Sequence, residues 1–350
     1  MIVYFADQQL VPIGAASTGL PRGVRLREDK LKRTVEGGVA EFEGRLVPAP
    51  GQGLADLERL VAPVNHILAK MDGAVELFTI IDTRYENDGE IWFSAESGGL
   101  ELLNHILLPL ANTAAHTFDW YAERILADTG FTVGTNEVPT LTRTITFDSA
   151  ETAVARLQKL AEEFEIEIDY SFEASGMTIT ARHVNARSRI GKDIGLSLRL
   201  GREVDSIQVS RSAAGLATAL YPTSGDVTLS GASYDDGDIY VDGVYLKSRD
   251  ALANWAGVGF RHIVKQFSGS ASDRAGLLTE SIRELKAVRS PETTYDVKLA
   301  YLPPNAAIGD TVHLIDETNG LYLASRITEL TTSESLGTRE ATLGEIMEET

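Results

Sequence analysis

Clustered carboxylates are the side chains of this sequence with the clearest chemical potential. One cluster could supply hard oxygen ligands to calcium, and another could supply paired acids for glycoside cleavage. The first lacks the spacing and the terminal glutamate of an EF-hand loop, and its Asp-Gly steps favour a turn between strands. The second falls at a helix end and along one face of the next strand, which favours a solvated surface. The clusters are Asp235, Asp236, Asp238 and Asp242, and Glu162, Glu163, Glu165 and Glu167.

Histidine, tryptophan and glycine offer the other candidates. The histidines show neither HExxH nor H-x-H spacing, so no zinc site is predicted. The tryptophans could line a sugar-binding surface, although core packing is their usual role. Because no glycine stretch has the frame of a phosphate loop or of a nucleophile elbow, we expect no catalytic, cofactor-binding or metal-binding residues. The residues considered are His66, His105, His116, His183, His262, His313, Trp92, Trp120 and Trp255.

Composition narrows the classes of function. The 350 residues include 32 Lys and Arg against 51 Asp and Glu, a formal net charge of −19. Such a surface repels a phosphate backbone, which argues against sequence-specific nucleic-acid binding, whereas a passage through which DNA slides could have acidic walls. The chain has no cysteine, which excludes disulfides and thiolate chemistry.

Export and membrane signals are lacking in the sequence. The first residues have no basic region typical of a signal peptide, and no run approaches the roughly 18 apolar residues that span a bilayer. We therefore expect synthesis in a cytoplasm and no membrane-spanning segment.

Strand patterns dominate residues 1–100. Polar and apolar residues alternate along 39–46, with Phe42 and Leu46 on the apolar face, as in a half-buried strand. Asn87, Asp88 and Gly89 supply turn chemistry between two further strand-like runs. Residues 1–100 are predicted to form an antiparallel barrel or sandwich.

Residues 101–190 mix helix and strand patterns. An apolar helical face begins near Thr117, and Gly130 is placed to end that helix. Asp148 and Glu151 have the spacing of a capping box before an amphipathic helix that runs to Phe164, and a strand hairpin follows. These residues predict an α+β insertion domain.

Two separated stretches, 191–230 and 293–350, return to strand patterns and could together form a second, split barrel. Between them, residues 231–292 are predicted to form a second insertion with a helix from about Ser272 to Val288, stopped by Pro291. The predicted fold class is α+β and β-rich, with two antiparallel β-barrels and α+β insertion domains.

Five segments, taken in order, resemble the hub proteins at the tip of long-tailed phage tails, including the N-terminal region of the tail-associated lysins. This family is also called prophage tail endopeptidase or phage minor structural protein. The evidence is the order of packing and turn patterns, because no single motif is diagnostic. The matching segments are 64–97, 117–136, 146–170, 198–225 and 295–316.

The resemblance implies a virion protein of the tail tip that forms a homotrimer. Each subunit would give two tube-type barrels to a pseudo-sixfold ring that matches the hexameric tail tube. The implied partners are the distal tail protein, the tail-tube ring, the tape-measure protein and tail fibres. The sequence ends at Thr350, where many family members continue into a peptidoglycan-cleaving or fibrous region, so no lytic activity is expected here.

The expected function is therefore that of a structural hub, not an enzyme, which closes the distal tube and organises host attachment and DNA exit. Two other classes stay open. One is a cell-wall (peptidoglycan) hydrolase, which needs opposed carboxylates or a metal triad. The other is a glycan-binding tail protein that uses Trp255, which lies in the least regular region.

Overall fold

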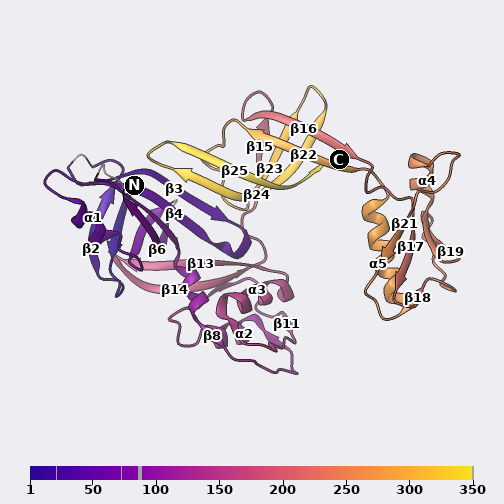
Figure 1. Ribbon diagram of the computed structural model, residues 1–350, viewed down its shortest axis with the longest axis horizontal. Helices are drawn as coiled ribbons and strands as arrows, with labels where there is room; N and C mark the ends of the chain where they lie inside the picture. Colours follow the sequence, from indigo (N-terminus) through magenta and orange to yellow (C-terminus); the bar gives the residue numbers. More distant parts are fainter. Residues whose placement is uncertain (21, 72, 86–88, 349–350) are drawn as a thin grey trace. The chain divides into compact units, whose positions relative to one another are not determined.

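The computed structural model describes residues 1–350 apart from 21, 72, 86–88 and 349–350. The chain forms two compact units, each with its own core (Figure 1). Unit 1 consists of Met1–Ser206 and Lys298–Thr350, and unit 2 of Ile207–Val297. Strands predominate throughout and helices are few, which confirms the β-rich α+β class.

The first part of unit 1 is a set of seven strands whose pairings form a closed circuit. The order is β1–β2–β3–β4–β7–β6–β5 and back to β1, with β2 and β3 parallel and the other pairs antiparallel. Helix α1 (Leu54–Leu60) lies between β4 and β5 in the sequence. The strands are β1 (Ile2–Ala6), β2 (Pro12–Ser17), β3 (Val24–Thr34), β4 (Ala40–Val47), β5 (His66–Met71), β6 (Ala74–Tyr85) and β7 (Ile91–Ser97).

Aromatic side chains fill this barrel. The ring of Phe42 lies 5.4 Å from that of Phe78 and 5.7 Å from that of Phe93, centroid to centroid. Along β4, Phe42 and Leu46 are buried while Glu41 is exposed, so the alternation predicted from the sequence is confirmed. Strands β6 and β7 pair antiparallel, but Asn87 and Asp88 of the predicted turn lie outside the described residues.

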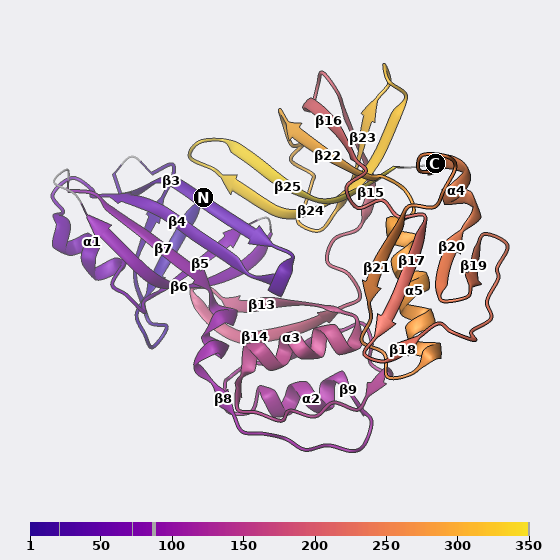
Figure 2. The same cartoon turned by 45° about the vertical axis from the view of Figure 1, so that its right-hand side comes forward.

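An α+β segment continues the same sheet, because Phe172 of β13 pairs with Val75 of β6. Its helices α2 and α3 lie side by side next to β13 and β14 (Figure 2). The larger elements are α2 (Phe118–Ile125), β10 (Thr132–Asn136), α3 (Ala153–Phe164), β13 (Glu167–Ser175) and β14 (Thr178–Arg187). The short ones are η2 (Gly98–Asn104), β8 (Ile106–Leu107), β9 (His116–Thr117), β11 (Thr142–Arg143) and β12 (Glu151–Thr152), whereas η1 (Glu36–Gly38) lies between β3 and β4 of the barrel.

The capping box predicted at Asp148 and Glu151 is wrong. Helix α3 begins at Ala153, and the hydroxyl of Thr152 caps it by accepting from the Ala155 N–H at 3.1 Å. The reason is that residues 151–152 pair with β8, which keeps the chain extended up to Thr152. Helix α2 likewise ends at Ile125, earlier than the stop predicted at Gly130.

The last strands of unit 1 extend the sheet beyond the barrel. Strand β24 pairs with β25 on one side, and with β23 and then β3 on the other, so one sheet joins the barrel to the C-terminal strands. Among the described strands, the pairings of this C-terminal part do not close a second circuit. The strands are β15 (Asp193–Arg199), β23 (Thr311–Asp316), β24 (Leu321–Ser333) and β25 (Thr338–Glu348).

Unit 2 is a five-stranded sheet with helix α5 (Arg274–Val288) against it. Leu277 and Leu285 of α5 are buried with Leu220 and Leu246, which pair across β17 and β20. The helix agrees with the predicted Ser272–Val288 to within two residues. The other elements are β17 (Ala219–Ser224), β18 (Val227–Thr228), β19 (Ile239–Asp242), β20 (Tyr245–Ser248), α4 (Arg249–Trp255) and β21 (Val264–Ser268).

Strands β16 (Val204–Ser212) and β22 (Glu292–Leu299) pair with each other and carry the chain into and out of unit 2. The sequence groups residues 219–228 with the strands of a second barrel. In the structure these residues pair instead with β20 and β21 of unit 2, since Leu220 belongs to the core under α5. The strands of the C-terminal part that lie wholly in unit 1 are β15, β23, β24 and β25.

Candidate functional site

Three aspartates of the acidic run 235–242 form ion pairs with basic side chains of unit 2. Hydrogen bonds from Arg249 and from the Gly237 N–H lower the pKa of Asp235 to about 2. Within the described part of the chain, no group of three or more acidic or histidine side chains is arranged to hold a metal ion. The run is therefore a turn region whose carboxylates are bound by neighbouring basic side chains. Its ion pairs are Asp235 with Arg249 at 2.8 Å, Asp242 with Lys247 at 2.5 Å, and Asp238 with Arg289.

Two of the glutamates around the end of α3, Glu162 and Glu167, line one cavity of about 460 Å³ together with Glu36. Glu162 and Glu163 are exposed on the helix, and Glu165 caps its C-terminus with a left-handed φ of 55°. Glu167 alone is half-buried, and it is bound by Arg326. Despite burial of the side chain, hydrogen bonds from Arg326 hold the pKa of Glu167 below its usual value, whereas the general acid of glycoside cleavage has a raised pKa.

The histidines are dispersed, and five of them contact a polar or aromatic side chain. Burial lowers the pKa of both His66 and His262 below the ordinary value, because it disfavours the imidazolium. The structure does not bring the six histidines together. The contacts are His66 with Thr79 at 3.3 Å, His183 with Thr132 at 3.0 Å, His262 with Thr218 at 3.1 Å, His313 with Asp193 at 3.0 Å, and His116 stacked on Trp120 at 3.6 Å.

The three tryptophans have different surroundings. Trp120 has His116 stacked 3.6 Å away and the Arg124 guanidinium 3.6 Å from its ring centre. The Arg84 guanidinium lies 4.8 Å from the ring centre of Trp92. Trp255, at the end of α4, is 42% exposed and precedes Val258 and Phe260, which are 98% and 68% exposed. Unit 2 therefore has an exposed apolar loop at 255–260.

Several polar groups converge at a junction within unit 1 that sequence reasoning missed. Arg326 of β24 donates to both carboxylate oxygens of Glu167 at 2.5 and 2.6 Å. It also donates to the carbonyls of Ile190 at 2.5 Å and Gly309 at 3.1 Å. A single guanidinium thus binds the α+β segment, the linker after β14 and the turn before β23. No local sequence pattern predicts this contact.

The electrostatics at this junction favour the ion pair. Burial by itself would raise the pKa of Glu167, but hydrogen bonds from Arg326 and from the Ile190 N–H, with the charge of Arg326, lower it below the usual value. A cavity of about 230 Å³ beside it contains two further pairs, Arg33 with Glu76 and Arg187 with Asp169. Charge-balanced walls of this kind suit a structural joint.

Two glycines cross next to Arg326. A Cβ on Gly191 would lie 2.0 Å from the carbonyl carbon of Gly309, and a Cβ on Gly309 would lie 2.3 Å from the Ile190 oxygen. Both residues also have positive φ, 75° and 81°. Since any side chain would clash with backbone, the crossing requires glycine.

The family model described as Prophage endopeptidase tail matches residues 192–348, somewhat less than half of the chain. No curated protein matches. The chain is similar to phage tail proteins. The resemblance proposed from the five ordered segments is confirmed.

Three solved structures carry the similarity over the full length. Prophage tail protein gp18 from Listeria monocytogenes has 12% identity and a TM-score of 0.54, covering 98% of this chain and 93% of its own. The 43 kDa tail protein of prophage MuSo2 from Shewanella oneidensis has 14% identity and a TM-score of 0.53, with 98% and 97% covered. The tail protein from Neisseria meningitidis has 13% identity and a TM-score of 0.51, with 99% and 96% covered. At these identities the shared property is the fold.

Among the described residues, no helix combines the length and the apolar character that crossing a bilayer demands.

Proposed function

We propose that the chain is a structural subunit of a phage tail tip or baseplate hub. The observation that carries this proposal is the extent of the fold likeness, because 98–99% of this chain aligns with 93–97% of three phage tail proteins. A likeness that covers both units leaves little of the chain for an added catalytic domain. The role is assembly without bond cleavage, located in the virion tail.

The finer proposal is a homotrimer that closes the distal tail tube. The closed circuit of seven strands supports one tube-type barrel per subunit, and the sheet formed by β15, β23, β24 and β25 supports the second. Three subunits with two such barrels each would present six similar elements to a hexameric tube. The distal tail protein and the tube ring would be the immediate neighbours, with the tape-measure protein and tail fibres as further partners.

Charge supports a passage for DNA in unit 1. Unit 2, Ile207–Val297, contains nine of the 32 basic and eleven of the 51 acidic residues, so nearly all of the acidic excess belongs to unit 1. A lumen lined by carboxylates would let DNA slide without binding during exit.

Electron microscopy of the purified chain tests this proposal. We expect rings with threefold symmetry whose inner part consists of six barrel-like lobes. The same sample incubated with purified tail tubes is expected to cap one end of each tube. Particles without rotational symmetry that leave the tube ends uncapped would contradict the proposal.

The alternative function is a cell-wall hydrolase, and the word endopeptidase in the name of the matching family favours it. A zymogram on bacterial cell wall separates the two functions. The hub proposal predicts no clearing by the full chain, whereas a clearing band that is lost on substituting a carboxylate would establish the hydrolase.

A further inference from the structure

Strand β3 contains a bulge that points a carboxylate at a distant part of unit 1. Arg27 pairs with Arg45 and Lys30 with Glu43, so Glu28 and Asp29 together lie opposite Gly44. Glu28 has a left-handed φ of 50°, a costly conformation for a residue with a side chain. Bulges of this kind redirect side chains, and Asp29 is only 2% exposed.

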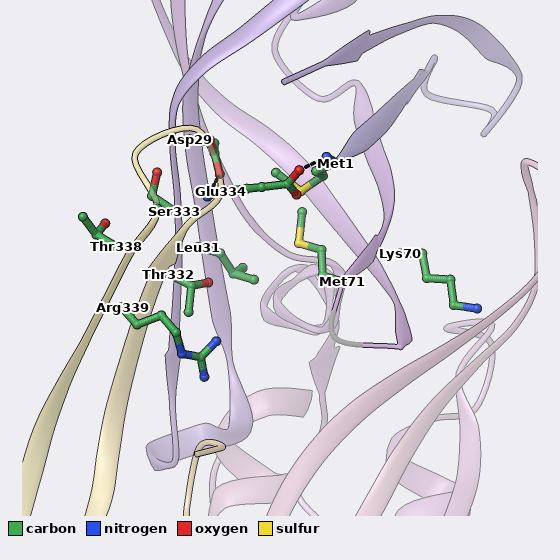
Figure 3. A pocket seen from close by; sticks show the side chains of 11 residues that line it. Met1, Asp29, Leu31, Lys70, Met71, Thr332, Ser333, Glu334, Thr338 and Arg339 are labelled. Atoms are coloured by element: carbon green, nitrogen blue, oxygen red, sulfur yellow. Dashed lines mark hydrogen bonds and ion pairs between the residues drawn. The ribbon is translucent and has the colours of Figure 1, made fainter. Parts of the chain in front are cut away.

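The buried carboxylate binds the tip of the hairpin formed by β24 and β25. Its two oxygens accept hydrogen bonds from the N–H groups of Glu334 and Ser335, each at 2.8 Å. The Asp29 N–H in turn donates to the Ser335 hydroxyl at 3.3 Å. Figure 3 shows Asp29 beside Glu334 and Ser333 at this tip. Bonds to an ionised acceptor are stronger than neutral ones.

The hydrogen bonds of Asp29 lie just beyond the end of the backbone ladder between β3 and β24. The ladder runs from the pair of Thr34 and Glu329 to the pair of Leu31 and Thr332, and then stops. Beyond it, the carboxylate replaces the carbonyl groups that a continuing strand would offer. The Asp29 carboxylate thus accepts two hydrogen bonds from the tip, and the Asp29 N–H donates a third. The Met1 ammonium and the Thr18 hydroxyl also bind the tip, through the Glu334 carboxylate.

A cavity lies beside this contact, between the barrel and the hairpin. It measures about 390 Å³, and Leu31, Met71, Thr332 and Arg339 are among its lining residues (Figure 3). At the tip, Leu336 is 62% exposed. Segments with few buried apolar contacts open at lower free energy than the core.

We propose that Asp29 is a latch that fastens the outer half of the β24–β25 hairpin, residues 329–343, to the barrel. The hairpin half is a strap that can detach as a unit while the barrel stays closed, because its base remains paired with β23. This joint lies where the barrel meets the C-terminal strands, and the inference does not depend on the role in a phage tail.

Amide hydrogen exchange on the full chain, comparing Asp29→Asn with the wild type, tests the latch. Asparagine keeps the size but replaces one acceptor by a donor that faces a backbone N–H. We expect exchange at Glu334 and Ser335, and along residues 339–343, to become about 10- to 100-fold faster, as expected for losing charged hydrogen bonds. Exchange along β7 of the barrel is expected to stay unchanged.

Asp316→Asn is the matched control. Asp316 is also buried, at 4% exposure, and it accepts from the N–H groups of Thr318 and Asn319 at 3.0 and 3.1 Å. It caps its own turn, not a remote one, so faster exchange is expected only at 318–319. Unchanged exchange at 334–335 in Asp29→Asn, or an equal acceleration in β7, would overturn the latch.

A second variant keeps the test decisive if Asp29→Asn does not fold. Lys32 and Thr331 are partners in the β3–β24 ladder, and the chain has no other cysteine to compete. In the double variant Lys32→Cys and Thr331→Cys, oxidation is expected to slow exchange in 329–343 at least about tenfold relative to the reduced form. Equal exchange in the two redox forms would show that the strap does not detach.

Discussion

Partners that are remote in the sequence decide what individual carboxylates do in this protein. Asp29 binds backbone more than 300 residues away, and Glu167 binds Arg326 across 159 residues. Asp235, in contrast, pairs with Arg249, fourteen residues further on. All three carboxylates form structural joints between segments of the chain.

Asp235 should titrate far below an ordinary aspartate. Its pKa is about 2 in the folded chain, because Arg249 and the Gly237 N–H stabilise the ionised form. Since the folded value is depressed, the stability that this group contributes is fully present above the unfolded value and is lost as the pH falls through about 2. Carboxyl-carbon NMR titration of the folded chain is expected to show no transition for Asp235 near 3.8, its ordinary value.

The matching variant is Arg249→Gln, which removes the charge and keeps a similar length. Its Asp235 is expected to titrate closer to the ordinary value. A wild-type Asp235 that already titrates near 3.8 would show that the pair with Arg249 does not form in solution.

Two segments of unit 1 meet where their backbones lie unusually close, at Gly191 and Gly309. The crossing of Gly191 and Gly309 brings the linker after β14 against the turn before β23, and Arg326 fastens both. Because this joint connects the α+β segment to the C-terminal strands, a disturbance there should affect all of unit 1.

Gly191→Ala should destabilise unit 1 by about 3–5 kcal/mol, combining backbone strain at positive φ with a direct clash. Gly195→Ala is the control, because Gly195 has a similar φ of 67° and nothing within 4 Å of the added Cβ. The control is expected to cost about 1–2 kcal/mol. Denaturant unfolding measures both, and equal losses would show that the crossing is looser than described.

Local patterns were enough to predict some elements and not others. The alternation along 39–46 and the stripe of α5 both come from side chains that face one core, so sequence periodicity revealed them. The start of α3 was missed because pairing with β8, more than forty residues away, overrides the local capping signal. The Asp29 and Arg326 joints were missed for the same reason, since neither has a local pattern.

At the scale of the whole molecule, the chain consists of two units of different character. Unit 2 has its own apolar core, and its paired strands β16 and β22 bring its two ends together. A unit of this kind can be inserted into a chain, or removed, with little effect on the remainder.

A polypeptide of residues 207–297 is therefore expected to fold by itself. It should show a cooperative thermal transition, and the Leu277→Ala variant should lower its stability by about 2–5 kcal/mol because Leu277 is fully buried. Circular dichroism during heating measures both. A polypeptide without a cooperative transition would show that unit 2 depends on unit 1.

The central claim is that the chain assembles into a trimer, and the absolute mass of the purified chain tests this claim most directly. Light scattering over a wide range of concentrations gives that mass independently of shape. The hub account predicts a stable species of about three times the 37.9 kDa of one chain. A monomer that persists at the highest concentration would contradict it.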